Sequence, residues 1–293
     1  MNDASFPSRS TSVKVSVIQF NSRDDENANV ERLLPLLDRA VAAGAKLVAL
    51  PETVWFRGRF EEAPGHKFPD PFLDRLRAFV RERKFWLYGG TLAERIPGED
   101  SRRFNTGFFI DPSGEIRGRY RKVHLFDIDL PDTKVTESRH TRPGEVLTLE
   151  KVEGWTFGQM ICYDVRFPEA WLALRLAGME AAVLPANFTK KTGEAHWEVL
   201  VRARAIENQV YILAAGQWGV HPGLNVPAFG HSMIVDPWGR ILASASGDED
   251  AILTAELDRE TLERVRREMP VLQHRRPSAY RLSRGNSFSD DKV

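Results

Sequence analysis

The only cysteine of the chain, Cys162, lies between two segments of different predicted structure. Residues 155–161 (WTFGQMI) predict a buried strand and residues 169–177 predict a helix, so Cys162 is expected at the turn between them. Such a turn offers free backbone N–H groups and the positive end of a helix dipole, which favour a thiolate or an oxyanion. A free cysteine is equally often a small core residue, so this segment alone leaves both interpretations open.

An acid and an amine follow two other predicted strands. Glu52 comes directly after the apolar segment 46–50 (KLVAL), and Lys122 ends the second strand of a hairpin. Sites in open α/β sheets gather at the carboxyl ends of strands, so an acid, an amine and a thiol in these places predict one site. No histidine ends a predicted strand, so a carboxylate in a dry pocket is the candidate base. The alternative for Glu52 is a solvated loop residue or a cap.

Strands and helices alternate in the first half of the chain. Residues 13–20 (VKVSVIQF) predict a strand, and Asn29 is expected to cap a helix that ends near Ala43, before Gly44. With the strand at 46–50, this order predicts a parallel pair joined by a right-handed crossover. A helix is then predicted at 71–83, strands at 86–92, 104–110 and 115–121, and turns at 97–100 and 111–114.

Residues 123–145 show no period, and a segment of that length without regular structure predicts a functional loop. Its polar residues include His124, Asp127, Asp129, Glu137 and His140.

The second half of the chain repeats the plan of the first. The turn 236–239 (DPWG) has the same chemistry as 111–114 (DPSG), which predicts two sheets built alike and packed face to face, with helices outside. The helix 194–209 is expected to bury Trp197, Leu200, Val201 and Ile206 and to expose Arg202 and Arg204. Strands are predicted at 181–185, 210–215, 231–236, 240–245 and 252–256, and a last helix, capped by Asp258, ends near 268.

The overall composition limits the possible partners. Forty-one basic residues balance 41 acidic ones in a chain of 293, so there is no field to attract nucleic acid or an anionic membrane, and a small molecule is the expected partner. One cysteine forms no internal disulfide, and no segment is apolar and long enough to span a bilayer, which together predict a cytoplasmic protein. We expect one domain over residues 13–280, with flexible tails at 1–12 and 281–293.

Three segments together resemble the signatures of the nitrilase superfamily of carbon–nitrogen hydrolases. They are 51–53 (PET), 120–127 (YRKVHLFD) and 161–169 (ICYDVRFPE), and the resemblance extends over about residues 13–280. It implies a four-layer α-β-β-α sandwich, a homodimer formed through the helix next to the nucleophile or a higher homo-oligomer, and a Glu-Lys-Cys triad. Glu52 would be the general base, Lys122 the cation at the tetrahedral intermediate and Cys162 the nucleophile. Glu137 matches a second glutamate that positions the substrate and the triad.

These roles are chemically consistent. Glu52 would take the thiol proton while Cys162 attacks an amide carbon, and the oxyanion would be met by the Lys122 ammonium and the Tyr163 backbone N–H. A thioester intermediate would then be hydrolysed, with no cofactor and no metal, because the histidines lack ligand spacing. Arg166 is the candidate for a substrate carboxylate, and its alternative role is an ion pair with Glu169 or Asp164. Asn187 and His196 are the remaining candidate substrate-binding residues, whereas His124 and His231 are expected to have structural roles.

The substrate is less clearly indicated. Tyr163-Asp164 replaces the Trp-Glu that usually follows the cysteine of true nitrilases, which favours an amide over a nitrile. Segments 195–200, 230–233, 236–239 and 270–277 resemble the deaminated glutathione amidase branch, whereas 126–131 (FDIDLP) is closer to the ω-amidases of 2-oxo acid amides. The sequence also leaves open an N-carbamoyl hydrolase, an acyltransferase and a catalytically silent domain of the same fold.

Overall fold

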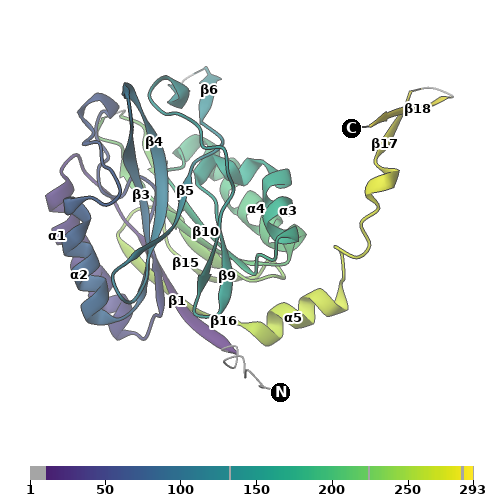
Figure 1. Cartoon of the computed structure of the whole chain (residues 1–293), viewed down its shortest axis with the longest axis horizontal. Helices are drawn as coiled ribbons and strands as arrows, with labels where there is room; N and C mark the ends of the chain where they lie inside the picture. Colours follow the sequence, from purple (N-terminus) through teal and green to yellow (C-terminus); the bar gives the residue numbers. More distant parts are fainter. Residues whose placement is uncertain (1–10, 132, 224, 285–286, 293) are drawn as a thin grey trace.

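The computed structural model describes residues 11–131, 133–223, 225–284 and 287–292. Two six-stranded sheets form the body of the protein, with helices on the outside (Figure 1). In each sheet three parallel strands lie in the middle, flanked by antiparallel strands. This arrangement is the four-layer α-β-β-α sandwich expected from the sequence.

The first sheet comes mainly from the N-terminal half and has the order β16-β1-β2-β3-β4-β5. The alternating segment after residue 12 forms β1, and the predicted crossover brings β2 and β3 parallel to it. Helices α1 and α2 cover its outer face (Figure 1). The bounds are β1 Ser12–Gln19, α1 Glu26–Ala42, β2 Leu47–Ala49, α2 Asp74–Arg83, β3 Trp86–Ile96, β4 Glu99–Ile110, β5 Ile116–Arg121 and β16 Ala251–Asp258.

The second sheet has the order β15-β14-β11-β10-β9-β8, and its outer face is covered by α3 and α4 (Figure 1). Its central strands are apolar along their whole length, as expected for strands buried on both faces. The bounds are β8 Leu149–Val152, β9 Trp155–Gln159, α3 Pro168–Leu176, β10 Ala181–Ala186, α4 Lys190–Asn208, β11 Tyr211–Gly216, β14 Met233–Val235 and β15 Ile241–Ser244.

The inner faces of the two sheets pack on each other. Val15, Val17 and Tyr88 of the first sheet belong to one buried cluster with Phe157 and Leu213 of the second. Side chains from both sheets therefore exclude water between the layers, which holds the strand ends of both sheets in a fixed relation.

The repeated turn is confirmed in atomic detail. Oδ1 of Asp111 accepts hydrogen bonds from the N–H groups of Ser113 and Glu115, and Oδ1 of Asp236 accepts them from Trp238 and Arg240 in the same way. The glycine that ends each turn has a φ of 83°, a conformation that other residues rarely adopt.

Two helix predictions need correction. Asp25, not Asn29, caps α1, by accepting a hydrogen bond from Ala28 N. Asn29 is buried inside the helix because its side chain donates to the carbonyls of Arg23 and Trp55. In α4 two residues, Arg204 and Ile206, have the opposite burial to the one predicted from the sequence.

Arg204 is buried, and Ile206 is 47 % exposed. Nε of Arg204 donates to the Val165 carbonyl and its Nη1 bonds Glu207, so these polar partners make burial of the guanidinium possible.

The segment 123–145 contains regular structure that the sequence pattern did not indicate. Strands β6 (Asp127–Leu130) and β7 (Thr133–Thr136) pair as a short hairpin, and a 3₁₀ turn follows at Glu137–Arg139. Four residues per strand are too few to display a period.

The remaining elements lie outside the two sheets. They are β12 Trp218–Val220, β13 Pro227–Phe229, α5 Arg259–Glu268, β17 Arg281–Arg284 and β18 Ser287–Lys292. Asp258 caps α5 as predicted. No helix among the described residues has both the length and the hydropathy needed to cross a membrane.

Candidate active site

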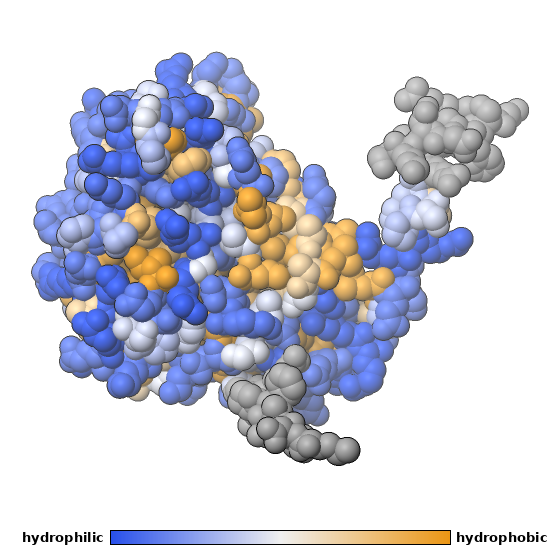
Figure 2. Space-filling view, in the orientation of Figure 1, coloured by the Kyte–Doolittle hydropathy of each residue, from blue (hydrophilic) through white to orange (hydrophobic). Residues whose placement is uncertain are grey.

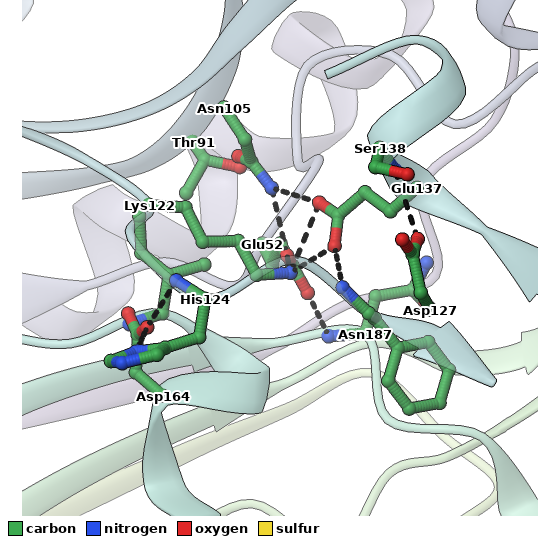
Figure 3. Close-up of polar contacts among 12 residues, drawn as sticks. Glu52, Thr91, Asn105, Lys122, His124, Asp127, Glu137, Ser138, Asp164 and Asn187 are labelled. Atoms are coloured by element: carbon green, nitrogen blue, oxygen red, sulfur yellow. Dashed lines mark hydrogen bonds and ion pairs between the residues drawn. The ribbon is translucent and has the colours of Figure 1, made fainter. Parts of the chain in front are cut away.

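A cavity of about 510 Å³ opens where strand ends of the two sheets meet. Glu52 follows β2, Lys122 follows β5, Cys162 follows β9 and Asn187 follows β10, and all four line this cavity. Figure 3 shows the polar contacts that connect Glu52, Lys122 and Asn187. The structure thus brings together the acid, the amine and the thiol that the sequence placed at separate strand ends.

Glu52 is held by three donors. Its Oε1 accepts hydrogen bonds from Asn105 Nδ2 (2.9 Å) and Lys122 Nζ (3.0 Å), and its Oε2 accepts one from Asn187 N (2.7 Å). The backbone next to Glu52 is packed closely on Gly90, where a Cβ atom would lie 2.1 Å from the Pro51 carbonyl oxygen. Glu52 is 4 % exposed, so these donors satisfy a buried carboxylate rather than a solvated one.

Lys122 lies between two carboxylates. Its Nζ donates to Glu52 and also to Glu137, at 2.9 Å from Oε2 and 3.1 Å from Oε1 (Figure 3). Burial alone would lower the pKa of Lys122, but the negative charges of Glu137 and Glu52 outweigh it and hold the pKa well above its usual value. The side chain is therefore an ammonium at neutral pH, as stabilisation of an oxyanion requires.

Glu137 reaches the site from the segment without sequence periodicity. Its Oε2 accepts a hydrogen bond from Phe126 N at 2.6 Å, which ties the start of the β6–β7 hairpin to Lys122. Asn105 Nδ2 also lies 3.4 Å from Glu137 Oε1. Asn105 is therefore in contact with both carboxylates.

Cys162 begins a 3₁₀ turn of residues Cys162–Arg166 and has a φ of 48°, in the left-handed region. Such backbone strain in a residue other than glycine is common at functional sites. Burial and then the negative charge of Glu52 raise the pKa of the thiol well above its usual value, against the opposing charge of Lys122. Burial thus favours the thiol over the thiolate, although the turn offers free backbone N–H groups. A neutral thiol needs a base, and Glu52 is the carboxylate that acts on it in the cavity.

Asp164 braces this turn. The carboxylate is fully buried and accepts hydrogen bonds from Tyr120 Oη (2.8 Å), Ile161 N (2.8 Å) and His124 N (3.1 Å). It also contacts His124 Nδ1 at 2.7 Å (Figure 3). Asp164 therefore links the segment that carries Lys122 to the turn that carries Cys162, and His124 has the structural role expected of it.

Of the other candidate residues, only Asn187 lines the cavity. Tyr163 directly follows Cys162 in the first turn of the 3₁₀ helix, where backbone N–H groups lack intrahelical acceptors. Tyr163, Arg166 and His196 are all absent from the cavity lining; Arg166 Nη2 lies 3.3 Å from His196 Nδ1. Among the described residues Arg166 forms no ion pair with Glu169 or Asp164, and its guanidinium lies over the rings of Tyr163 and Phe188.

Several cavity residues were not found from the sequence. Arg57 and His221 come from loops whose sequence shows no period. Asn105 lies within β4, where the alternation of residues indicates which face of the strand it occupies but not that it belongs to the site. Arg139 is exposed at the cavity and forms no ion pair in the described part of the chain. Within those same residues, no group of three His, Cys, Asp or Glu side chains is placed to hold a metal ion.

A buried thiol beside a carboxylate and an ammonium, at the strand ends of a four-layer sandwich, defines a hydrolase of the nitrilase type. The chain belongs to the carbon–nitrogen hydrolase family, whose sequence profile matches residues 14–267. It is therefore a hydrolase that acts on amides.

Known relatives agree with this assignment. A deaminated glutathione amidase from Dictyostelium discoideum is 33 % identical over 92 % of this chain and 96 % of its own length. A nitrilase and fragile histidine triad fusion protein from Drosophila melanogaster is 36 % identical over 96 % of this chain, which spans 61 % of that protein. The crystal structure of a Saccharomyces cerevisiae protein from branch 10 of the nitrilase superfamily has a TM-score of 0.82 and 33 % identity, covering 91 % of this chain and 97 % of that one.

Proposed function

We propose that this protein is a cysteine-dependent amidase that works through a thioester on Cys162. The observation that carries the proposal is the convergence of Cys162, Glu52 and Lys122 on one cavity. Because burial and the Glu52 charge favour the protonated thiol, the nucleophile must be generated by proton transfer, and Glu52 is the carboxylate that lines the same cavity.

In the acylation step Glu52 takes the thiol proton as the Cys162 sulfur forms a bond to the amide carbon. The carbonyl oxygen becomes an oxyanion, which the Lys122 ammonium and the Tyr163 N–H stabilise. Glu52 then gives its proton to the amide nitrogen, the carbon–nitrogen bond breaks, and the amine or ammonia leaves.

In the deacylation step a water molecule attacks the thioester. Glu52 removes a proton from this water as the second tetrahedral intermediate forms, and returns it to the sulfur when the carbon–sulfur bond breaks. The carboxylic acid product leaves, and Cys162 is again a thiol. Glu137, which shares Lys122 with Glu52, keeps the ammonium in place through both steps.

The favoured substrate is deaminated glutathione, a 2-oxo acid joined by an amide to a dipeptide. The name of the Dictyostelium relative and the downstream segments of the chain support it. A substrate of this size also lets binding energy from the remote dipeptide position the scissile amide and raise the rate. The cavity of about 510 Å³ has the size typical of small-molecule sites.

The second candidate is an ω-amidase activity on 2-oxoglutaramate or 2-oxosuccinamate. The observation that favours it is the segment 126–131, whose first residue, Phe126, lines the cavity and donates its N–H to Glu137. 2-Oxoglutaramate shares the acyl half of the favoured substrate and differs only in the leaving group, whereas the acyl part of 2-oxosuccinamate is one methylene shorter.

A substrate panel tests both candidates. Deaminated glutathione, 2-oxoglutaramate, 2-oxosuccinamate, an N-carbamoyl amino acid and a simple nitrile are compared by kcat/KM from released amine or ammonia. We expect deaminated glutathione to rank first. A clear preference for 2-oxoglutaramate would make the protein an ω-amidase, and a preference for the carbamoyl compound or the nitrile would refute both.

A further inference from the structure

Arg57 is a buried cation in the wall of the cavity. The residue is 1 % exposed and lies in the cavity lining. Its Nη1 donates to Asn21 Oδ1 (3.0 Å) and to the Trp218 carbonyl (2.9 Å), and its Nη2 donates to the Gly219 carbonyl (3.2 Å). Within the described ranges of the chain, the buried Nε has no hydrogen-bond partner, and no carboxylate pairs with the guanidinium.

The guanidinium nevertheless keeps its charge. Burial lowers the pKa of Arg57 to about 10, which is still far above neutral pH. A buried charge without a counter-charge is costly, and neutral carbonyls compensate it only partly. An anion bound in the cavity would supply the missing counter-charge.

His221 places this charge close to the reacting groups. It lines the cavity, and its pKa is lowered to about 4, first by burial and then by the positive charge of Arg57, while Glu52 opposes the shift. The imidazole therefore feels both Arg57 and Glu52 and is neutral at physiological pH. It therefore offers Arg57 no counter-charge, and Arg57, His221 and Glu52 line the same cavity.

We propose that Arg57 determines substrate specificity by attracting a carboxylate on the acyl part of the amide. This inference rests on the proposed amidase function and deepens it. Arg57 is buried in the wall of the cavity, where the effective dielectric constant is low. Its attraction for a substrate carboxylate is therefore much stronger than the same interaction in water. The preferred substrates are then amides of dicarboxylic or 2-oxo dicarboxylic acids, and neutral amides of the same shape are poor substrates.

A purely structural role for Arg57 makes a different prediction. Its bonds to the Trp218 and Gly219 carbonyls hold β12 against the loop that carries Arg57. If that were its whole function, a substitution would impair every substrate equally. The ratio of activities toward a charged and a neutral substrate separates the two roles.

The test compares two amides that differ only in charge. 2-Oxoglutaramate carries a terminal carboxylate, and 4-oxopentanamide has a methyl group in its place. We expect the wild type to prefer the anionic amide, and Arg57→Gln to lower that ratio of kcat/KM values by about 30-fold. Arg57→Lys keeps the charge and should keep most of the preference. The matched control is Arg59→Gln, which changes an exposed arginine outside the cavity lining and should give the wild-type ratio.

Two outcomes would overturn the proposal: a wild-type ratio near one, or an equal loss on both amides in Arg57→Gln. If Arg57→Gln does not fold, a wild-type ratio near one still overturns the proposal, and Arg57→Lys, which keeps the charge, tests whether the preference depends on this position. Calorimetric binding of 2-oxoglutarate against 4-oxopentanoate provides a readout that does not depend on turnover. A protein that binds 2-oxoglutarate more tightly than 4-oxopentanoate, loses that difference in Arg57→Gln and hydrolyses no amide of the substrate panel would refute the proposed function while keeping the recognition of a carboxylate by Arg57.

Discussion

The Nζ atom of Lys122 lies 3.0 Å from Oε1 of Glu52, and the two residues are only 2 % and 4 % exposed. A carboxylate is buried this deeply only when it is paired and hydrogen-bonded. The Lys122 ammonium thus allows the Glu52 carboxylate to lie buried in the cavity, next to the protonated thiol of Cys162. The first prediction follows from this pairing.

Glu52→Gln should keep the fold and lose activity. Glutamine preserves the shape and a carbonyl acceptor for Lys122 and Asn105, and loses only the hydrogen bond from Asn187 N, but it does not accept the thiol proton. We expect kcat to fall by about 100- to 10,000-fold, the usual contribution of general base catalysis. Single-turnover acylation kinetics measure the effect, with the exposed Glu62→Gln as the control. Near-normal product release from Glu52→Gln would show that another group is the base.

Cys162 should be the one site of covalent inactivation. It is the only cysteine of the chain, so iodoacetamide should add one label and abolish activity in proportion, as read by intact-mass spectrometry and residual turnover. Cys162→Ala should retain the fold and lose at least about 10,000-fold in kcat. Substantial turnover by this variant would exclude a thioester mechanism.

Asp164→Asn should disturb the nucleophile without touching the substrate. The amide that replaces a carboxylate oxygen presents N–H groups to the donors Tyr120 Oη and Ile161 N, which then lose their acceptor. We expect the free energy of unfolding to fall by about 2–4 kcal/mol and kcat to fall more than KM changes. Urea unfolding and steady-state kinetics measure the two effects.

Tyr120→Phe removes a single donor and should have the same effects at reduced size. Asp248→Asn, at an exposed position, is the control. An Asp164→Asn variant with wild-type kcat would contradict a positioning role for this carboxylate.

The sequence predicted the parts of this molecule whose pattern is local. The apolar strands β1, β2, β10 and β11 and the two DPxG turns have signals within a few residues, and three strand ends indicated where Glu52, Lys122 and Cys162 meet. Their meeting also depends on how the two sheets pack, because Glu52 and Lys122 follow strands of the first sheet and Cys162 follows a strand of the second.

The remainder depends on tertiary partners that no local pattern reveals. Asn29 and Arg204 are buried because carbonyl groups distant in sequence accept their hydrogen bonds. Arg57 and His221 enter the cavity wall from irregular loops, and the raised thiol pKa of Cys162 reflects its burial and then the charge of Glu52. Only the three-dimensional structure reveals these features, because residue type and spacing do not determine them.

His66 should stabilise the protein in a pH-dependent way. It is 5 % exposed, with Nε2 lying 2.6 Å from Glu26 Oε1 and Nδ1 lying 3.3 Å from Asp70 Oδ2. Burial alone would lower its pKa, but Glu26 and Asp70 outweigh it and raise the pKa. The stabilisation is therefore fully present below the usual histidine pKa of about 6.5 and is lost as pH rises through the raised value.

His66→Gln should accordingly lower the free energy of unfolding by about 1–3 kcal/mol at pH 5.5 and by less at pH 9. Urea titrations of the wild type and the variant at both pH values measure the difference, with the exposed His274→Gln as the control. A destabilisation that is the same at both pH values would show that the ion pairs contribute nothing.

The face formed by α3 and α4 should bind a second copy of this chain. Figure 2 shows hydrophobic residues gathered over these helices, and Val199 (68 %), Leu176 (56 %) and Ile206 (47 %) are largely exposed there. We propose a homodimer through this face, because an apolar patch beside the nucleophile helix suits isologous packing.

The double variant Val199→Glu with Ile206→Glu would bury unpaired charges in this interface. It should weaken dimerisation at least about 100-fold and leave a folded monomer. Analytical ultracentrifugation measures this, with Val220→Glu on β12 as the control, and an active wild-type monomer would refute it.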